Sequence, residues 1–490
     1  MAMDTETIRA RILEAYRQGP EVVVKLVVEL VTQLEALAER ITALEAENAA
    51  LRAKLGTNSR NSGKPPSSDG PGVKPHPKSQ RTPTGRKTGG QPGHSGHTLR
   101  LADKPDEVQV HTPSHCQGCG QSLERAPVVR RERRQVLDIP PVKVRVVEHQ
   151  AETKCCPGCG VETTGAFPAG VDAPAQYGPG AATVAVYLNQ EQLLPLERTC
   201  AAMADLFGCP IAEGTVESAV AACHEQLVEV EAAIKGQVEG ADVAHFDETG
   251  LNVGGKSSWL HVASTSGLTF YAAHQKRGRE ALDDMGVLPS FRGTAVHDGL
   301  SSYWQYGDCQ HALCNAHHLR ELTFVAEQLG QGWAQELKEL LLQIKRAVEV
   351  AREQGLAALA AATKRAFEAR YDALLEAGLK MNPPPEPTGK RGRPARGKAG
   401  NLVDRLREHK EAALAFMEDF AIPFDNNQAE RDIRMVKVKE KISGCFRTMS
   451  GADRFCRIRG YISTLRKQGI PILSALGQAM AGNPPLPGAT

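Results

Sequence analysis

The chain has 490 residues, of which 41% are hydrophobic and 24% charged, with a net charge of only +2. At about 150 residues per domain, this length predicts roughly three domains. The composition excludes a collagen-like, wholly disordered or membrane-embedded protein. No run of ~18 apolar residues occurs, so we expect no membrane span. The first residues lack the pattern of a secretory signal, so we expect a cytoplasmic protein.

The basic residues are concentrated in three blocks. Residues 60–100 contain eight Lys and Arg against one acid, residues 390–398 five against none, and residues 431–467 eleven against three. Any one such block is usually a solvated linker or helix face. Three blocks in one chain favour contact with nucleic acid.

Residues 1–55 have the pattern of a helix with a heptad seam. One seam position is Val or Leu throughout, and the other carries a single polar residue, Asn48. This pattern favours a parallel two-stranded coiled coil, because the side-chain amide of a buried Asn forms its hydrogen bonds only when it lies opposite the same Asn of the partner helix. Arg40 would face Glu45 of the partner, and Glu47 would face Arg52. The alternative is a helix that packs on its own chain. The seam residues are Val23, Leu30, Leu37, Leu44 and Leu51 with Val27, Leu34, Ile41, Asn48 and Leu55.

The next segment, residues 56–105, is rich in Gly, Pro, Ser and basic residues and has no apolar period. Such a composition predicts a disordered or extended linker. The linker either lies along DNA phosphates or serves only as a tether.

Residues 106–165 contain two C-x-x-C-G turns, separated by 36 residues with strand-like alternation at residues 142–146. Two such turns joined by strands predict a four-thiolate zinc ribbon, although the spacing is longer than the commonest one. A redox C-x-x-C is the competing interpretation, but it does not explain two matched copies. Cys155 is either a substitute ligand or a bystander. The predicted zinc ligands are Cys116, Cys119, Cys156 and Cys159.

Residues 175–240 are helical in pattern. A helix over Leu196–Leu206, a turn at Phe207-Gly208 and a second helix from Thr215 resemble a helix-turn-helix. The same arrangement is common in plain helical bundles, so DNA reading by this segment stays open.

From Val243 the pattern changes to short apolar runs separated by glycine. Runs from Val243, Trp259 and Leu268 predict three adjacent antiparallel strands. A fourth buried strand begins near Gly293 and ends on an acid. We therefore expect Asp247 and Asp298 at the ends of two strands of one sheet.

A third acid, Glu430, lies at the start of a basic helix. Asn427 and Glu430 have the spacing of a capping box, and Glu430 can pair with Arg434. Asp298-Gly299 alone is also a turn signal. Together, however, the acids Asp247, Asp298 and Glu430 would repel one another unless divalent cations lay between them. Two magnesium ions so held can activate a water or a 3′-hydroxyl and stabilise the leaving oxygen of a phosphodiester.

Several motifs spread over nearly the whole chain carry a family resemblance. They are the N-terminal helix, the block TNSRNSGKPPSSD at residues 57–69, the paired C-x-x-C-G turns, Asp247-Glu-Thr, His297-Asp298-Gly, Cys314-Asn-Ala-His317 and Asp425-Asn-Asn-Gln-Ala-Glu430-Arg431. In these motifs the chain resembles transposases of the insertion sequence 66 family. The resemblance implies a ribonuclease-H-like core whose D-D-E triad is Asp247, Asp298 and Glu430, binding Mg²⁺ or Mn²⁺. It also implies a largely helical insertion between the second and third acids.

The pair Cys314-x-x-His317 is similar to a Cys-x-x-His signature of related transposases. A metal site needs more ligands, and none lies at a suitable spacing nearby in the sequence. We interpret Cys314 and His317 as structural residues or residues that support the metal ligands, with Arg320 near a DNA phosphate. The alternative is a buried helix cysteine beside surface histidines.

We therefore expect a multidomain α+β DNA transposase that cuts at element ends and transfers the 3′-hydroxyl strand to target DNA. Arg431, Arg434, Lys437 and Lys441 would hold the DNA backbone. We also expect a bacterial, nucleoid-associated homodimer or higher synaptic complex, because the heptads can pair two chains and two element ends need two active sites. The resemblance implies that small proteins of the same element assist it. A non-catalytic zinc-ribbon regulator and a ribonuclease-H-like nuclease without strand transfer are the alternatives. The expected parts are a coiled-coil segment (1–55), a basic linker (56–105), a zinc ribbon (106–165), a helical segment (175–240), a catalytic core (241–320 and 421–470), a helical insertion (321–420) and a C-terminal tail (471–490).

Overall fold

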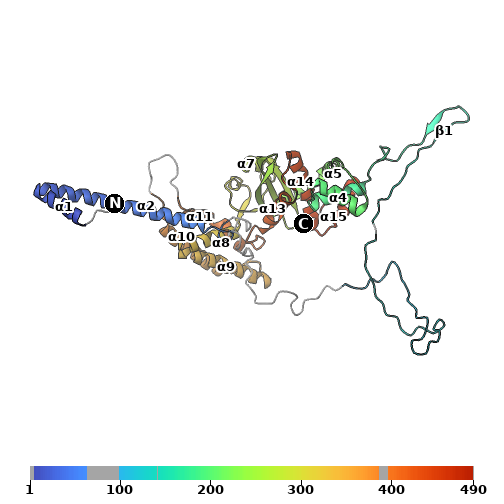
Figure 1. Ribbon diagram of the computed structural model, residues 1–490, viewed down its shortest axis with the longest axis horizontal. Helices are drawn as coiled ribbons and strands as arrows, with labels where there is room; N and C mark the ends of the chain where they lie inside the picture. Colours follow the sequence, from blue (N-terminus) through green and yellow to red (C-terminus); the bar gives the residue numbers. More distant parts are fainter. Residues whose placement is uncertain (1–4, 63–98, 141, 386–395, 489–490) are drawn as a thin grey trace. The chain divides into compact units, whose positions relative to one another are not determined.

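The computed structural model describes residues 5–62, 99–140, 142–385 and 396–488 (Figure 1). Most of the first basic block and of the block at 390–398 lies outside these ranges. The chain divides into two compact units. One comprises residues 1–77, 175–200 and 212–490, and the other comprises residues 78–174 and 201–211.

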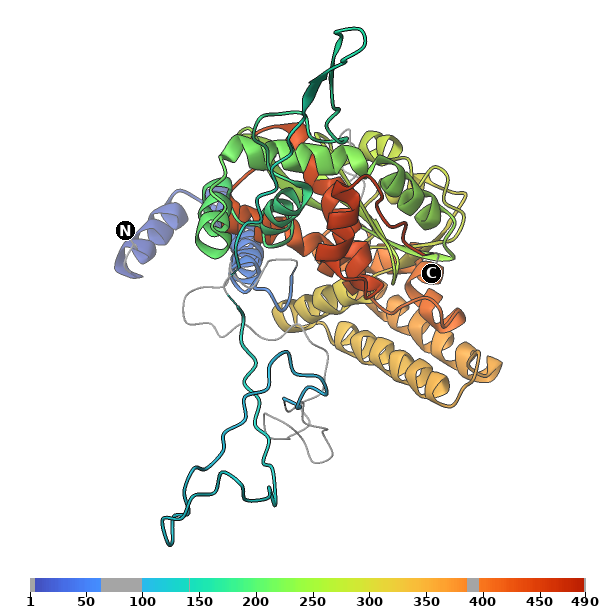
Figure 2. The same ribbon diagram turned by 90° about the vertical axis from the view of Figure 1, so that its right-hand side faces the viewer.

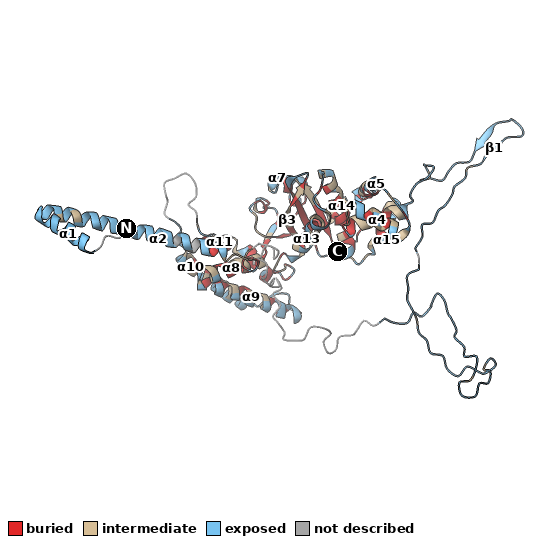
Figure 3. Ribbon diagram, viewed as in Figure 1, coloured by how far each residue is buried: buried red, intermediate tan, exposed pale blue. Residues whose placement is uncertain are grey.

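The first unit begins with two helices, α1 (Thr5–Arg17) and α2 (Pro20–Leu55), so the expectation of one helix over residues 1–55 was wrong. The chain breaks at Gly19, whose φ of 112° suits glycine, and Pro20 opens α2, where its missing N–H costs nothing. All predicted seam residues fall on α2. Figure 3 shows α2 exposed along its length, and most seam side chains are open to solvent.

The centre of the first unit is a mixed five-stranded sheet in the order β5-β4-β3-β6-β7. The first three strands along the chain pair antiparallel, as predicted, and β6 and β7 then add in parallel beside β3. The strands are β3 (Val243–Val253), β4 (Lys256–Ser264), β5 (Thr269–His274), β6 (Thr294–His297) and β7 (Gln310–Leu313).

Successive side chains of β3 point to opposite faces of the sheet, so they pack into two different apolar cores. Ala244 and Phe246 pack with helix residues on one face, and Leu251 and Val253 pack on the other. Asp247 has the parity of Leu251, so it faces the side on which α13 (Asn427–Ser443) contacts β3 and β4. The fold thus places a carboxylate at an edge of this second core.

Helices before and after the sheet in sequence cover its Phe246 face. Val220, Ile234 and Tyr461 share one core with the sheet, and Leu476 joins them. Residues 472–480 are therefore a packed helix, and the predicted C-terminal tail was wrong for them. The elements are α3 (Pro179–Val186), the π-helix η2 (Tyr187–Glu191), α5 (Glu213–Gln226), α6 (Val228–Glu239), α7 (Arg279–Met285), the 3-10 helix η3 (Tyr303–Gln305), α14 (Met449–Lys467) and α15 (Ile472–Met480). Another helix, α4 (Leu196–Phe207), begins in the first unit, and its residues from 201 on belong to the second.

Between β7 and α13 the chain is helical. These helices have their own apolar core, built around Trp333, Leu337 and Tyr371, which also includes Val296 and Leu313 from the sheet. α9 and α10 lie side by side in both views (Figures 1 and 2). The helices are α8 (Asn315–Leu329), α9 (Gly332–Glu353), α10 (Ala361–Met381), α11 (Lys398–Glu408) and α12 (Lys410–Glu418).

The second unit contains little regular structure. Its two short strands, β1 (Thr153–Cys155) and β2 (Glu162–Thr164), pair antiparallel around the second C-x-x-C turn. In the described residues the strand expected at 142–146 is not formed, and Val142, Val144 and Val146 are exposed. Across the described ranges, no helix is long and apolar enough to cross a membrane.

Candidate functional site

The two predicted aspartates lie side by side where parallel pairing ends. His245 pairs with Val296, and the same register continued by two residues brings Asp247 opposite Asp298. Asp298 follows the last residue of β6, as predicted. Asp247 is instead the fifth residue of the eleven-residue β3, because β3 continues beyond β6 to pair with β4.

The turn after β6 is fixed by its backbone. Gly299 has a φ of +92°, a conformation that suits glycine, and its N–H donates to His297 Nδ1 at 3.0 Å. The Leu300 N–H donates to Asp298 Oδ1 at 3.0 Å. Nε2 of His297 in turn lies 3.0 Å from His311 Nδ1 on β7. These contacts hold Asp298 at the carboxyl end of its strand.

Asp247 lies in a strongly negative environment. Burial raises the pKa of its carboxyl well above the usual range, and the charges of Glu248, Asp298 and Glu430 raise it further. One hydrogen bond, from the Glu248 N–H to Asp247 Oδ1 at 2.9 Å, acts in the opposite direction. The protein alone does not compensate this carboxylate, so a cation at this place would be strongly bound.

Glu430 lies in the first turn of α13, as predicted, but not in a capping box. The N-cap is Asn426, and the Asn427 N–H donates to Asp425 Oδ1 at 3.1 Å. Glu430 is instead near two residues of α8: its Oε1 lies 3.8 Å from His317 Nδ1 and 3.7 Å from Arg320 Nη2. The capping-box alternative is therefore wrong, and Glu430 points toward α8.

Asn426 connects Glu430 to the sheet. Its side chain, 1% exposed, accepts from His245 Nδ1 and donates to the Phe246 carbonyl, both at 2.8 Å. Its backbone N–H donates to Cys314 Sγ at 3.1 Å, and its carbonyl accepts the Glu430 N–H at 3.2 Å. One buried amide thus links α13 to the residues immediately before Asp247 and to the end of β7.

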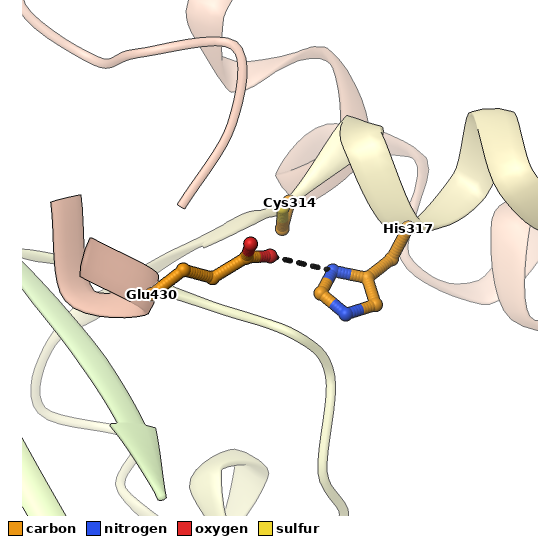
Figure 4. Close-up of side chains that lie close together, drawn as sticks. All are labelled: Cys314, His317 and Glu430. Carbon is orange, nitrogen blue, oxygen red and sulfur yellow. Dashed lines mark ion pairs between the residues drawn. The ribbon is translucent and has the colours of Figure 1, made fainter. Parts of the chain in front are cut away.

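Cys314, His317 and Glu430 come together although 116 residues separate the first from the last. One ligand atom from each lies within 4.8 Å of the others, and they form the single such group of three found in the described part of the chain (Figure 4). Burial raises the pKa of the Cys314 thiol to about 12. His318 is buried rather than on the surface, so the alternative of surface histidines fails for it.

Glu248 is a fourth acid at the site whose surroundings the sequence did not reveal. Its carboxylate accepts from Arg277 Nε and Nη2 at 2.9 and 2.7 Å and from the Tyr303 hydroxyl at 2.6 Å. Burial and the charge of Asp298 raise its pKa, whereas these hydrogen bonds lower it. The apolar runs around Glu248 gave no signal for Arg277 or Tyr303, which lie 29 and 55 residues away.

The basic residues of α13 form one exposed face. Arg431, Arg434, Lys437 and Lys441 are all exposed and recur at three- or four-residue steps. Lys437 also donates to the Gly250 carbonyl and lies 3.0 Å from Glu440. This face begins one residue after Glu430.

The two C-x-x-C turns have the same backbone conformation. Gly120 N donates to the Cys116 carbonyl at 2.9 Å and Gly160 N to the Cys156 carbonyl at 2.8 Å, and both glycines have positive φ. Backbone N–H groups lower the pKa of Cys116 and of Cys156. The structure does not bring the four sulfurs together. Cys155 Sγ donates to the Gly160 carbonyl at 3.4 Å.

Comparisons with known protein families agree with this organisation. The family described as transposase IS66 family matches residues 174–454, and the zinc-finger binding domain of transposase IS66 matches residues 113–160. A family of unknown function (DUF6444) matches residues 8–100. The search of curated proteins finds no match. Since the first match spans more than half of the chain and includes the sheet, Asp247, Asp298 and Glu430, this protein belongs to the IS66 family of transposases.

Proposed function

We propose that this transposase cuts DNA at element ends and joins the freed 3′-hydroxyl to target DNA at a centre formed by Asp247, Asp298 and Glu430. One observation carries the proposal: Asp247 lies on β3, Asp298 directly follows the adjacent parallel strand β6, and Asn426 ties the helix bearing Glu430 to β3. The strand order, with three antiparallel strands followed by two parallel ones, supports a ribonuclease-H-like core.

The residues at this centre suit divalent magnesium or manganese. All three candidates are oxygen donors, which these hard cations prefer. Burial is the main cause of the raised pKa of Asp247, and the negative charges of Glu248, Asp298 and Glu430 add to it, as expected where acidic ligands await a cation. When bound, a pair of such ions supplies an activated hydroxyl and stabilises the leaving oxygen. The chain itself holds the carboxylates in place through the turn after β6 and the side chain of Asn426.

DNA would lie along the basic face of α13. Arg431 and Arg434 project from the turn that also carries Glu430, so phosphates held by them would lie next to the acids. Substitution of these residues should weaken binding to all sequences alike and reduce its salt dependence.

We propose that the second unit becomes a zinc ribbon when four thiolates meet on one ion. The matched turns and the lowered pKa of Cys116 and Cys156 support this assignment. Cys116, Cys119, Cys156 and Cys159 would be the ligands, and their union would order a unit that has few strands of its own.

We further propose that α2 pairs in parallel with α2 of a second copy. Leu30, Leu37 and Leu44 are about half exposed in one chain, which an isolated helix of this length would not favour. Pairing would bury them and place Asn48 opposite its counterpart. Two copies would bring two centres to two element ends.

Substitution of the acids tests the function. Alanine at Asp247, Asp298 or Glu430 should abolish magnesium-dependent cleavage and joining of end-containing duplexes while leaving gel-shift binding nearly intact. Full activity in excess chelator would contradict the metal centre. Cleavage without joining would support a nuclease, and binding without cleavage a non-catalytic regulator.

A further inference from the structure

Cys314, His317 and Glu430 offer a ligand set that magnesium does not prefer. A thiol, an imidazole and a carboxylate lie within 4.8 Å of one another at the meeting point of β7, α8 and α13 (Figure 4). Sulfur and nitrogen ligands select zinc and similar ions, whereas magnesium selects oxygen alone. The cluster therefore differs in chemistry from the aspartate pair beside it.

We propose that Cys314, His317 and Glu430 form a binding site for Zn²⁺ or a similar transition-metal ion, and that occupation of this site withdraws Glu430 from the magnesium centre. The first part concerns binding alone. The second part, inhibition, rests on the catalytic role proposed above for Glu430.

The local backbone suits metal binding. Cys314 is the N-cap of α8 and His317 lies in its first turn, so both side chains project from one end of the same helix. The Asn426 N–H already donates to Cys314 Sγ, and this bond offsets part of the effect of burial, which favours the neutral thiol. When a metal ion binds, the sulfur–metal bond replaces the S–H bond and the proton leaves to solvent.

The dimensions require only small movements. With metal–ligand bonds of ~2.0–2.3 Å, ligands around tetrahedral zinc lie ~3.3–3.8 Å apart. His317 Nδ1 and Glu430 Oε1 are already 3.8 Å apart. The His317 and Glu430 side chains are 33% and 25% exposed, so an ion can enter from solvent and a water can complete its coordination.

The charges around Glu430 determine how an ion at this site would compete with the magnesium centre for the Glu430 carboxylate. Glu430 now faces Arg320 Nη2 at 3.7 Å, a distance typical of a loose ion pair. A divalent ion bound by the Cys314 thiolate would attract the Glu430 carboxylate more strongly than Arg320 does. The magnesium centre would then lose one of its three carboxylates, and raising magnesium should oppose the effect.

Cobalt(II) binding to full-length protein with a zinc-loaded second unit tests the site itself. In an Asp247→Ala background, which is expected to be unable to cut DNA, we expect one additional cobalt ion per chain and a thiolate-to-cobalt charge-transfer band. Cys314→Ser should remove the band. His317→Gln should weaken binding by at least about tenfold, a loss that even outer-shell changes produce. Cys445→Ser, at an exposed cysteine after α13, is the matched control and should leave the band unchanged.

An unchanged band in Cys314→Ser, or no additional cobalt in the parent, would overturn the site. Melting curves show whether Cys314→Ser is still folded. If it is not, weaker cobalt binding by His317→Gln is the result that tests the site. Because this readout needs no cleavage, it stands or falls independently of the proposed function.

Zinc inhibition of magnesium-dependent cleavage tests the second part. We expect zinc to inhibit the parent, added magnesium to relieve the inhibition, and His317→Gln to be about tenfold less sensitive relative to its own zinc-free rate. Cobalt binding at the site combined with equal zinc sensitivity in parent and His317→Gln would overturn the withdrawal of Glu430.

Discussion

Asn426→Ala should reduce cleavage more than any other change outside the three acids. The substitution removes two buried side-chain hydrogen bonds, to His245 Nδ1 and to the Phe246 carbonyl, and leaves both partners unsatisfied. Each unsatisfied buried group costs about 1–3 kcal/mol, so we expect a loss of roughly 2–6 kcal/mol in the free energy of unfolding. Domains have a stability of about 5–15 kcal/mol, so most of the protein should remain folded.

The loss of activity should exceed what unfolding explains. Without its side-chain anchor, the first turn of α13 is held to the sheet by fewer bonds, and Glu430 can move relative to Asp247. A displacement of about 1 Å at a catalytic group can cost on the order of 100-fold in rate. We therefore expect about 10–100-fold slower single-turnover cleavage by protein that urea titration shows to be folded.

Asn427→Ala is the matched control, since Asn427 is the next residue, is exposed and makes no side-chain hydrogen bond within the described residues. It should leave both stability and cleavage close to those of the parent. Cleavage at the parental rate by destabilised Asn426→Ala would refute the positioning role, as would an equal loss in both variants.

Three further outcomes follow from other parts of the chain. Protein that carries Cys314→Ser, and so lacks the second proposed zinc site, should contain about one zinc ion per chain by elemental analysis, and adding Cys119→Ser should remove it without lowering the melting temperature of the first unit. Asn48→Ile should tighten self-association and admit oligomers above the dimer, as measured by light scattering, and unchanged mass would argue against the coiled coil. Burial lowers the pKa of His261 to about 4, whereas an unfolded histidine titrates near 6.5. Its neutral form is thus favoured in the fold, and its contribution to stability is lost as pH falls from 6.5 toward 4; in His261→Gln the urea midpoint should fall less over this range.

The sequence predicted four of the five strands, because each of these has a strong local signal, whereas β7 was missed. Short apolar runs bounded by glycine gave β3, β4 and β5, and the run before Asp298 gave β6. Acids beside such runs were recognisable as site residues for the same reason. The position of Asp247 within β3 was wrong, because strand length depends on which neighbour continues to pair.

Contacts between distant segments were not predictable in the same way. Asn426 reaches Phe246 across 180 residues, and Glu430 reaches Cys314 across 116. Local sequence patterns do not indicate contacts between distant segments. The sequence around Cys314 and His317 therefore did not reveal Glu430 as their third partner. Likewise, the short segment at 472–480 gave no sign of the core that receives Leu476.

The four acids of the site differ in how the protein compensates their charge. Glu248 is held by Arg277 at 2.7 Å and by the Tyr303 hydroxyl, and its side chain is 1% exposed. Opening this short pair is costly on the side of Glu248, because its buried carboxylate would lose a partner, although the Arg277 side chain is partly exposed. Glu248 is therefore committed to the protein, although it adjoins Asp247 in sequence.

Basic groups of the protein neutralise the negative charge less completely at the other three acids, which are Asp247, Asp298 and Glu430. Within the described residues Asp247 and Asp298 have no ion pair, and Glu430 has only pairs of 3.7 and 3.8 Å. The uncompensated charge thus lies on Asp247 within β3, on Asp298 directly after β6, and on the Glu430 carboxylate, which can exchange partners. A divalent cation would bind there at the lowest cost in broken contacts, which is why we assign the metal to these three acids and not to Glu248.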